Sequence, residues 1–353
     1  MKKDILKNYC STIDTKTYRK IEKGLVYLPL GIFATDVILT TFVDPQFHSY
    51  LSPVYCASIT SGILAATYNG RMWTTDVQEL RSLYDDFIKK YNELNKLLGL
   101  KDPYEIQLVY QYLYENGYLS KDKNFEFNNR KHKDISYILG TEVINGSGVC
   151  RHIASLLSDI LNDYGILSTR LGVNTHYYYI DLKEKGNMSK EEVEAWAREN
   201  IVDEDRLSLF LYSLSKTDGQ SYKVECVDYT KLHPISKLIG NHAITYANYD
   251  GKSYYLDPTQ DSFYRRSDKN GSLYDFFNQV DIKNGGVEYD KERYKKCIKL
   301  INEGLPSINF EEQKEIENRT NELIISSNNL FEEFYKDNEK LYSDISSKLL
   351  KIK

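Results

Sequence analysis

The sequence predicts an α+β protein in which helical regions flank one compact segment of mixed helices and strands. Three observations support this fold class. Apolar residues recur at helical spacing on both sides of the segment, a glycine-rich turn inside it leads into another amphipathic helix, and two alternating stretches joined by a turn follow. The 353 residues are enough to bury a core and to form two or three modules.

Residues 1–72 contain a stretch that is poor in charge. Between Gly24 and Gly70 the only charged residues are Asp36 and Asp44. Two apolar runs, Leu25–Val43 and Leu51–Tyr68, each approach the ~18 to 20 residues that cross a bilayer. We therefore expect two apolar helices here, arranged as a helical hairpin that associates with a membrane through residues 25–68.

The charges around this hairpin favour an orientation with both ends in the cytoplasm, because basic residues stand outside both runs. A buried helical pair in a soluble protein remains the alternative, since Asp36 would cost roughly 2.5 to 3.5 kcal/mol in a bilayer. No cleavable signal peptide is expected. The chain is thus expected to be cytoplasmic, or membrane-anchored with a cytoplasmic catalytic domain. The flanking basic residues are Arg19, Lys20, Lys23 and Arg71.

Residues 73–135 are expected to form a helical linker region. Apolar residues alternate spacings of three and four from Asp76 to a stop near Gly99, and a second helix should run from Pro103 to Gly117. The span from Ser120 to Lys133 is polar and is expected to be a loop. The C-terminal region, residues 267–353, again shows apolar residues at helical spacing and is expected to be helical.

The compact segment is expected to cover residues 136–266, with a charged insertion over residues 181–220. The insertion should contain its own helix, because Ser189 and Glu192 have the spacing at which each side chain bonds the other residue's backbone amide.

Within the segment, a glycine-rich turn at Gly146-Ser147-Gly148 leads into a helix predicted from Cys150 to Tyr164, with Gly165 as its C-terminal stop. The Cys150 thiol therefore lies in the first turn. Unpaired amides and the positive end of the helix dipole favour a thiolate there, as a nucleophile requires, and can hold an oxyanion. A cysteine at a helix start is by itself more often inert.

His242–Ala247 and Lys252–Asp257 predict two strands joined by the turn-rich linker Asn248–Gly251. If the whole linker forms the loop, His242 lies opposite Asp257. If only Asp250-Gly251 turn, the pair is diagonal but stays on one face. Either register lets the carboxylate orient the imidazole, whereas a three-residue loop would separate the two side chains.

These residues give the chain a family resemblance. The order Gly-Val-Cys-Arg-His-Ile-Ala, then Asn-His-Ala-Ile, then Tyr-Leu-Asp-Pro-Thr resembles the transglutaminase-like superfamily of papain-like cysteine enzymes over about residues 137–264. The resemblance implies a papain/transglutaminase-like core, in which the nucleophile helix packs on an antiparallel sheet. It also implies Cys150 as nucleophile, His242 as general base and acid, and Asp257 as the residue that orients His242.

The activity expected from this set is cleavage or transfer of an amide through a thioester acyl-enzyme, with a peptide or protein as substrate. Resemblance to bacterial members favours a cysteine peptidase. A protein-glutamine transglutaminase or deamidase, and a non-catalytic membrane-associated scaffold that binds peptides, remain open. His152, two residues after the nucleophile, is expected to be structural or to contact substrate rather than to be catalytic.

Composition excludes other classes of function. A net charge of -5 and the lack of a dense Lys/Arg block argue against nucleic acid as a partner, because phosphate neutralisation needs clustered cations. The five cysteines are scattered, include no CxxC pair and indicate a reducing compartment. No histidine spacing predicts a metal site and no nucleotide-binding motif is present, so no cofactor is expected. The cysteines are Cys10, Cys56, Cys150, Cys226 and Cys297.

Overall fold

The computed structural model describes residues 10–25, 70–121, 138–181, 187–200, 221–225, 242–259, 272–282 and 291–353, together with isolated positions between them. Nearly all of the apolar stretch 25–68, and with it the expected hairpin, lies outside these residues, as does most of the expected loop 120–133. Among the helices that are described, none has the length and apolar character needed to span a bilayer.

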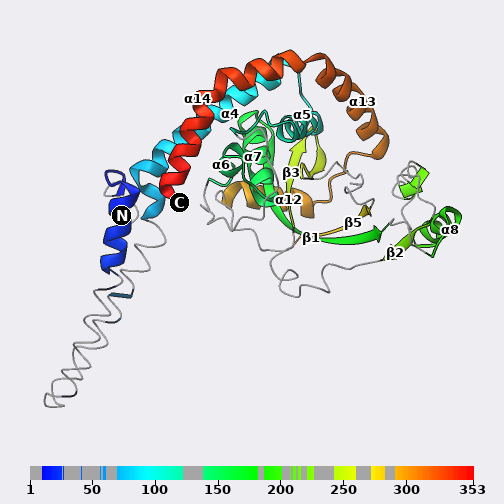
Figure 1. Cartoon of the computed structure of the whole chain (residues 1–353), viewed down its shortest axis with the longest axis horizontal. Coiled ribbons are helices and arrows are strands. Elements are labelled where there is room, and N and C mark those ends of the chain that lie inside the picture. The colour runs from blue at the N-terminus through cyan, green and yellow to red at the C-terminus, as the bar shows by residue number, and fades with distance from the viewer. Residues whose placement is uncertain are drawn as a thin grey trace. The chain divides into compact units, whose positions relative to one another are not determined.

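The chain divides into two compact units, which are described separately. One comprises Met1–Phe87 and Ser343–Lys353, and the other comprises Ile88–Tyr342. Two long helices run through both units: α4 (Thr75–Leu97) and α14 (Asn328–Ile352) (Figure 1). This division differs from the four regions expected from the sequence, because the segment 136–266 shares its unit with residues on both sides.

In the larger unit, the three helices whose starts the sequence predicts, α5 (Pro103–Glu115), α7 (Cys150–Asp163) and α8 (Lys190–Asn200), begin close to the expected residues. The helix expected from Pro103 is capped by Asp102, whose side chain accepts a hydrogen bond from the Tyr104 amide at 2.7 Å, while Glu105 bonds back to the Asp102 amide. The remaining helices of this unit are α6 (Thr141–Ile144), α12 (Lys291–Asn302) and α13 (Phe310–Ser326).

An antiparallel sheet accompanies these helices, so the chain is broadly α+β as predicted. Its strands are β1 (Leu167–Asp181), β2 (Lys223–Glu225), β3 (His242–Tyr249), β4 (Lys252–Leu256) and β5 (Ser272–Ile282). The order is β2-β1-β3-β4, with β5 paired to β1. The long strand β1 therefore organises the sheet, since it pairs with β2, β3 and β5.

Strand β5 corrects the sequence prediction, which placed residues 267–353 in a helical region. Ser272–Ile282 pairs with β1 instead, from Val173↔Ile282 to Asp181↔Ser272. The strand was missed because its apolar residues follow neither a strict two-residue alternation nor a helical spacing, and because its partner lies about a hundred residues earlier in the chain. These apolar residues are Leu273, Tyr274, Phe276, Phe277, Val280 and Ile282.

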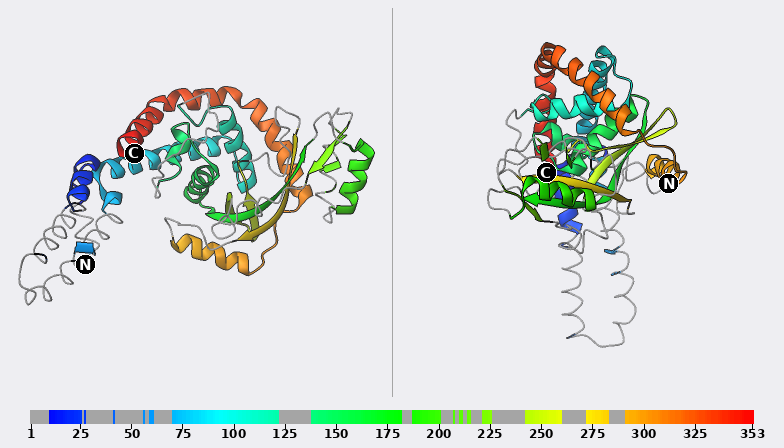
Figure 2. Two further views of the ribbon diagram at one scale, coloured as in Figure 1. Left: turned by 60° about the horizontal axis from the view of Figure 1, so that its bottom comes forward. Right: turned by 90° about the vertical axis from the view of Figure 1, so that its right-hand side faces the viewer.

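Helices cover both faces of the central strands (Figure 2). Side chains alternate between the two faces along each strand. On one face, Leu171 and Val173 of β1 and Ile244 and Tyr246 of β3 are buried against Cys297 of α12. On the other face, Ser168 and Thr245 make hydrogen bonds to α7. Helix α7 is therefore held on one face of the sheet, and α12 covers the opposite face.

The insertion is an elaborated hairpin loop between β1 and β2. The bonds Met188 N–H to Tyr222 O (3.0 Å) and Tyr222 N–H to Met188 O (2.7 Å) close its base. Its helix α8 begins as predicted, with the Ser189 amide bonded to Glu192 Oε2 at 2.7 Å and the Glu192 amide bonded to Ser189 Oγ at 3.2 Å. It has a small core of its own, formed by Val193, Ala197, Phe210, Leu214 and Tyr222.

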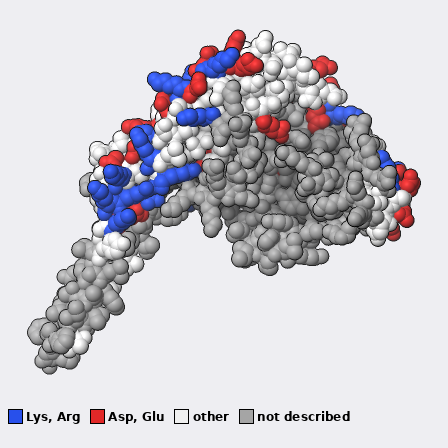
Figure 3. Space-filling model, viewed as in Figure 1, with Lys and Arg blue, Asp and Glu red and all other residues white. Residues whose placement is uncertain are grey.

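The smaller unit joins an N-terminal helix (residues 15–25) to parts of α4 and α14. Asp14 caps the N-terminal helix, accepting the Thr17 amide at 2.8 Å. The Thr15 amide donates to Asp76 at 2.8 Å, and Lys348 of α14 pairs with the same carboxylate at 3.4 Å. Lys and Arg side chains gather where the N-terminal helix and the C-terminal end of α14 lie (Figure 3).

Candidate active site

A tight turn places Cys150 at the first residue of α7. Gly146 adopts φ +76°, a left-handed conformation that favours glycine, and the Ser147 amide donates to the Glu142 carbonyl at 2.8 Å. A Cβ added at Gly148 would meet Val143 of α6 at 3.4 Å, an ordinary van der Waals distance. The requirement for glycine before Cys150 therefore comes from the left-handed turn at Gly146.

His152 supports the start of this helix. Its ring is fully buried, and its Nδ1 accepts a hydrogen bond from the Val149 amide at 3.0 Å. The first amides of a helix have no partner within the helix, so the ring satisfies one donor that would otherwise be unpaired. This contact gives His152 a structural role, one of the two expected from the sequence.

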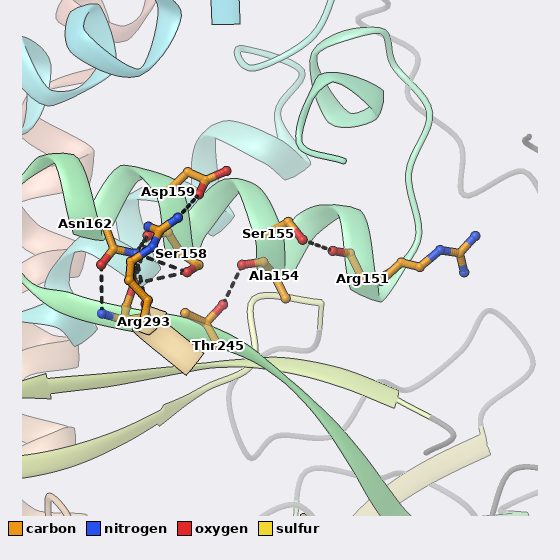
Figure 4. Close-up of polar contacts among 9 residues, drawn as sticks. Arg151, Ala154, Ser155, Ser158, Asp159, Asn162, Thr245 and Arg293 are labelled. Atoms are coloured by element: carbon orange, nitrogen blue, oxygen red, sulfur yellow. Dashed lines mark hydrogen bonds and ion pairs between the residues drawn. The ribbon is translucent and has the colours of Figure 1, made fainter. Parts of the chain in front are cut away.

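Hydrogen bonds fix α7 against the sheet (Figure 4). Thr245 Oγ1 of β3 donates to the Ala154 carbonyl at 2.9 Å, one turn after Cys150. Further along the helix, Asn162 Nδ2 donates to Ser168 O at 2.9 Å, and Asp159 pairs with Arg293 of α12 at 3.5 Å. These bonds set the position of α7 relative to β3, and with it the position of Cys150 relative to His242.

The hairpin of β3 and β4 adopts the two-residue turn, which was one of the two registers that the sequence left open. Tyr249 pairs with Lys252, so only Asp250 and Gly251 form the loop. Their φ values, +49° and +72°, are both positive, as a type I′ turn requires. Extending this register places Ile244 opposite Asp257, and His242 is therefore diagonal to Asp257.

The diagonal pair meets through its side chains. His242 Nε2 lies 2.7 Å from Asp257 Oδ2, and the His242 side chain is 7% exposed. The other carboxylate oxygen, Oδ1, accepts the Thr259 hydroxyl at 2.6 Å and the Thr259 amide at 3.1 Å. The Thr259 hydroxyl also lies 3.4 Å from His242 Nε2. Thr259 thus fixes Oδ1 of Asp257, while Oδ2 contacts the His242 ring.

Cys150 completes the cluster. Its side chain makes a hydrogen bond with His242 and receives a backbone hydrogen bond from Ala243. Burial is the largest influence on its pKa and would raise it. The hydrogen bond and charge of His242, together with the Ala243 amide, outweigh burial, so the pKa of the Cys150 thiol lies below its ordinary value. The site therefore favours the thiolate.

The structure brings together the three residues that the sequence singled out, Cys150, His242 and Asp257. Thr259 was not among the residues predicted from the sequence. The signal was available, since Asp-Pro-Thr is a sequence in which an Asp carboxylate can accept the amide two residues on. Arg151 extends from the N-terminal end of α7, away from the helix–sheet contacts (Figure 4). Within the described ranges, no group of three His, Cys, Asp or Glu residues could hold a metal ion.

No model of a known protein family, no curated protein sequence and no solved structure matches this chain. The chemistry inferred for the site therefore rests on its own residues and their geometry.

Proposed function

We propose that this chain is a cysteine peptidase that uses Cys150, His242 and Asp257 through a thioester acyl-enzyme. The observation that carries the proposal is the chain of contacts from the Cys150 thiol to His242 and from His242 to Asp257, at the start of a helix. A helix that begins with the cysteine and packs on an antiparallel sheet with the histidine and the carboxylate also supports a papain/transglutaminase-like core, the family that the sequence resembles.

Each residue has a defined part in the reaction. The Cys150 thiolate attacks the carbonyl carbon of a peptide bond, forming a C–S bond and an oxyanion, and backbone amides in the first turn of α7 are placed to donate to that oxyanion. Protonated His242 gives its proton to the leaving amine as the C–N bond breaks. Because Nε2 of the His242 ring faces Asp257, we assign the proton transfer from His242 to the leaving amine to the other ring nitrogen, Nδ1.

Hydrolysis of the thioester regenerates the enzyme. Neutral His242 removes a proton from water, the resulting hydroxide attacks the acyl carbon, and the C–S bond breaks to return the thiolate and release a carboxylic acid. An amine in place of water would give transamidation instead. We favour hydrolysis, and the identity of the acceptor is an outcome of the experiment below.

The test is turnover of a peptide library by the full-length chain, with products identified by mass spectrometry. Cys150→Ala should abolish turnover, because the nucleophile is lost. The matched control is Cys56→Ala, which removes another thiol that is exposed and carries no role here. Cleaved peptides identify a peptidase, and products joined to an added primary amine identify a transglutaminase. Turnover that survives Cys150→Ala would refute the mechanism, and the lack of any turnover by the wild-type chain would favour a peptide-binding scaffold.

A further inference from the structure

The N-terminal helix presents a row of lysines to solvent. Lys16, Lys20 and Lys23 are all exposed. Their spacing of four and three residues places them on one face of the helix. The row ends one residue before Gly24, where the charge-poor stretch 24–70 begins.

The fold adds cations from the other end of the chain. The Arg19 guanidinium donates to the Ile352 carbonyl at the end of α14. This bond holds the end of α14, with the exposed Lys351, beside the N-terminal helix. Residues more than three hundred positions apart therefore lie together, and Figure 3 shows Lys and Arg side chains gathered in this part of the molecule.

Within the described residues, two of the nearby carboxylates pair with cations outside the row of lysines. Asp14 caps its own helix and stays ionised, because hydrogen bonds from Thr17 lower its pKa, so it offsets part of the charge of Lys16. Glu22 pairs with Arg71 at 3.0 Å, and Asp76 pairs with Lys348 at 3.4 Å. Asp344 is exposed on α14 but lies two turns before Lys351, about 10 Å along the helix axis.

We propose that this basic surface, formed by Lys16, Lys20, Lys23 and Lys351, binds the anionic headgroups of a membrane. Clustered cations bind anionic lipid surfaces, with roughly fivefold gained per Lys or Arg near the surface. The position of the cluster favours lipid over other polyanions, because in the sequence the row of lysines directly precedes a stretch with two apolar runs of bilayer length. The chain as a whole is acidic, which disfavours a nucleic acid partner.

The experiment measures which lipids gather around the full-length chain in vesicles of two parts phosphatidylcholine and one part phosphatidylglycerol. Energy transfer from Trp73, which lies in the short helix η2 (Arg71–Trp73), reports on dansyl-labelled lipid close to this surface. A Trp196→Phe background removes the other tryptophan. The readout is the ratio of transfer to dansyl-phosphatidylglycerol over transfer to dansyl-phosphatidylcholine, and it remains meaningful whether residues 25–68 insert or not.

The proposal predicts a ratio several-fold above one that falls toward one in 0.5 M salt, because salt screens exposed charges. The triple variant Lys16→Gln, Lys20→Gln, Lys23→Gln should also bring the ratio close to one. The matched control removes three exposed lysines from α12 (Lys291, Lys295 and Lys299, each to Gln) and should keep the wild-type ratio.

Four results would overturn the proposal. Three are a wild-type ratio of one, a triple variant that keeps the wild-type ratio, and a control variant that loses it equally. The fourth is that added RNA binds the chain and displaces it from the anionic lipid. Cys150→Ala should leave the ratio unchanged, so the lipid surface and the peptidase proposal can fail independently.

Discussion

Asp257 uses its two carboxylate oxygens for different partners. Oδ2 meets the His242 ring at 2.7 Å, and Oδ1 accepts two hydrogen bonds from Thr259. A carboxylate that was held only by the ring could rotate and lose the alignment. In the proposed mechanism Thr259 is therefore a positioning residue, which acts through Asp257 on the His242 imidazole.

Replacing Thr259 by Val should reduce kcat roughly 10- to 100-fold with little change in KM, because the variant keeps the shape but loses the hydroxyl bond, and a hydrogen bond to a charged group contributes about 1.5 to 3 kcal/mol. Thr259→Ser should recover most of the loss. Steady-state kinetics on a peptide substrate checks both variants. Equal activity of the Val and wild-type enzymes would remove Thr259 from the mechanism.

At this scale the sequence predicted the three residues of the cluster but not the fourth. Cys150 was predictable because a glycine turn before an amphipathic helix fixes its place in the first turn. His242 and Asp257 were predictable because an even-numbered loop keeps both on one face of the hairpin. The Thr259 contact depends on how the chain turns after β4, and spacing alone does not fix that turn.

Among the elements, the β3–β4 turn has the largest effect on the candidate site, because its length determines whether His242 and Asp257 lie on the same face of the hairpin. The two-residue loop at Asp250-Gly251 sets the register that makes His242 and Asp257 diagonal neighbours. A shift by one residue would move one of the two side chains to the opposite face of the sheet. The left-handed φ of Gly251 is therefore a requirement of the catalytic geometry as well as of the turn.

Gly251→Ala should destabilise the protein by about 1 kcal/mol, because a Cβ disfavours the left-handed conformation at φ +72°. Nothing lies within 4 Å of the added Cβ, so the cost should come from the backbone alone. Gly251→Asn should lose less, since Asn tolerates this conformation. Urea unfolding measures both changes, and an Ala variant that is as stable as wild type would contradict the assigned turn.

Helices were more predictable than strands. The Pro103 start of α5 and the cap at Ser189 could be identified from residues within one turn, and α7 begins at the predicted residue. Strand β5 could not be predicted in the same way, because its pairing with β1 joins distant parts of the chain and its local pattern is irregular. The extent of β1 to Asp181 likewise depends on partners that lie far away in the sequence.

On the scale of the whole molecule, the chain combines a candidate catalytic unit with a smaller unit whose sequence includes the apolar stretch 25–68. The sequence predicts that this stretch enters a membrane, and we propose that the basic surface of the smaller unit binds the lipid headgroups. The two-unit division could not be predicted, because it depends on α14 returning from the C-terminal end to the N-terminal helix.

Full-length protein in cell membranes should stay in the pellet after a wash in alkaline carbonate, which removes proteins bound only at the surface. The physical reason is that two apolar runs of bilayer length do not leave the hydrocarbon core. Immunoblotting of pellet and supernatant checks this result. Complete release into the supernatant would refute the hairpin while leaving lipid binding by the basic surface open.

The central claim is that His242 keeps the Cys150 sulfur ionised, and the pH dependence of its alkylation tests this most directly. The lowered pKa means that thiolate persists as pH falls below the ordinary thiol range. Iodoacetamide labelling of Cys150, followed by mass spectrometry, should therefore reach half its maximal rate at a lower pH in the native chain than in the urea-denatured chain. His242→Gln should remove this lowering, because burial, which raises the pKa, is then opposed mainly by the Ala243 amide. Identical pH profiles for the native and denatured chains, or a difference that persists in His242→Gln, would contradict the claim.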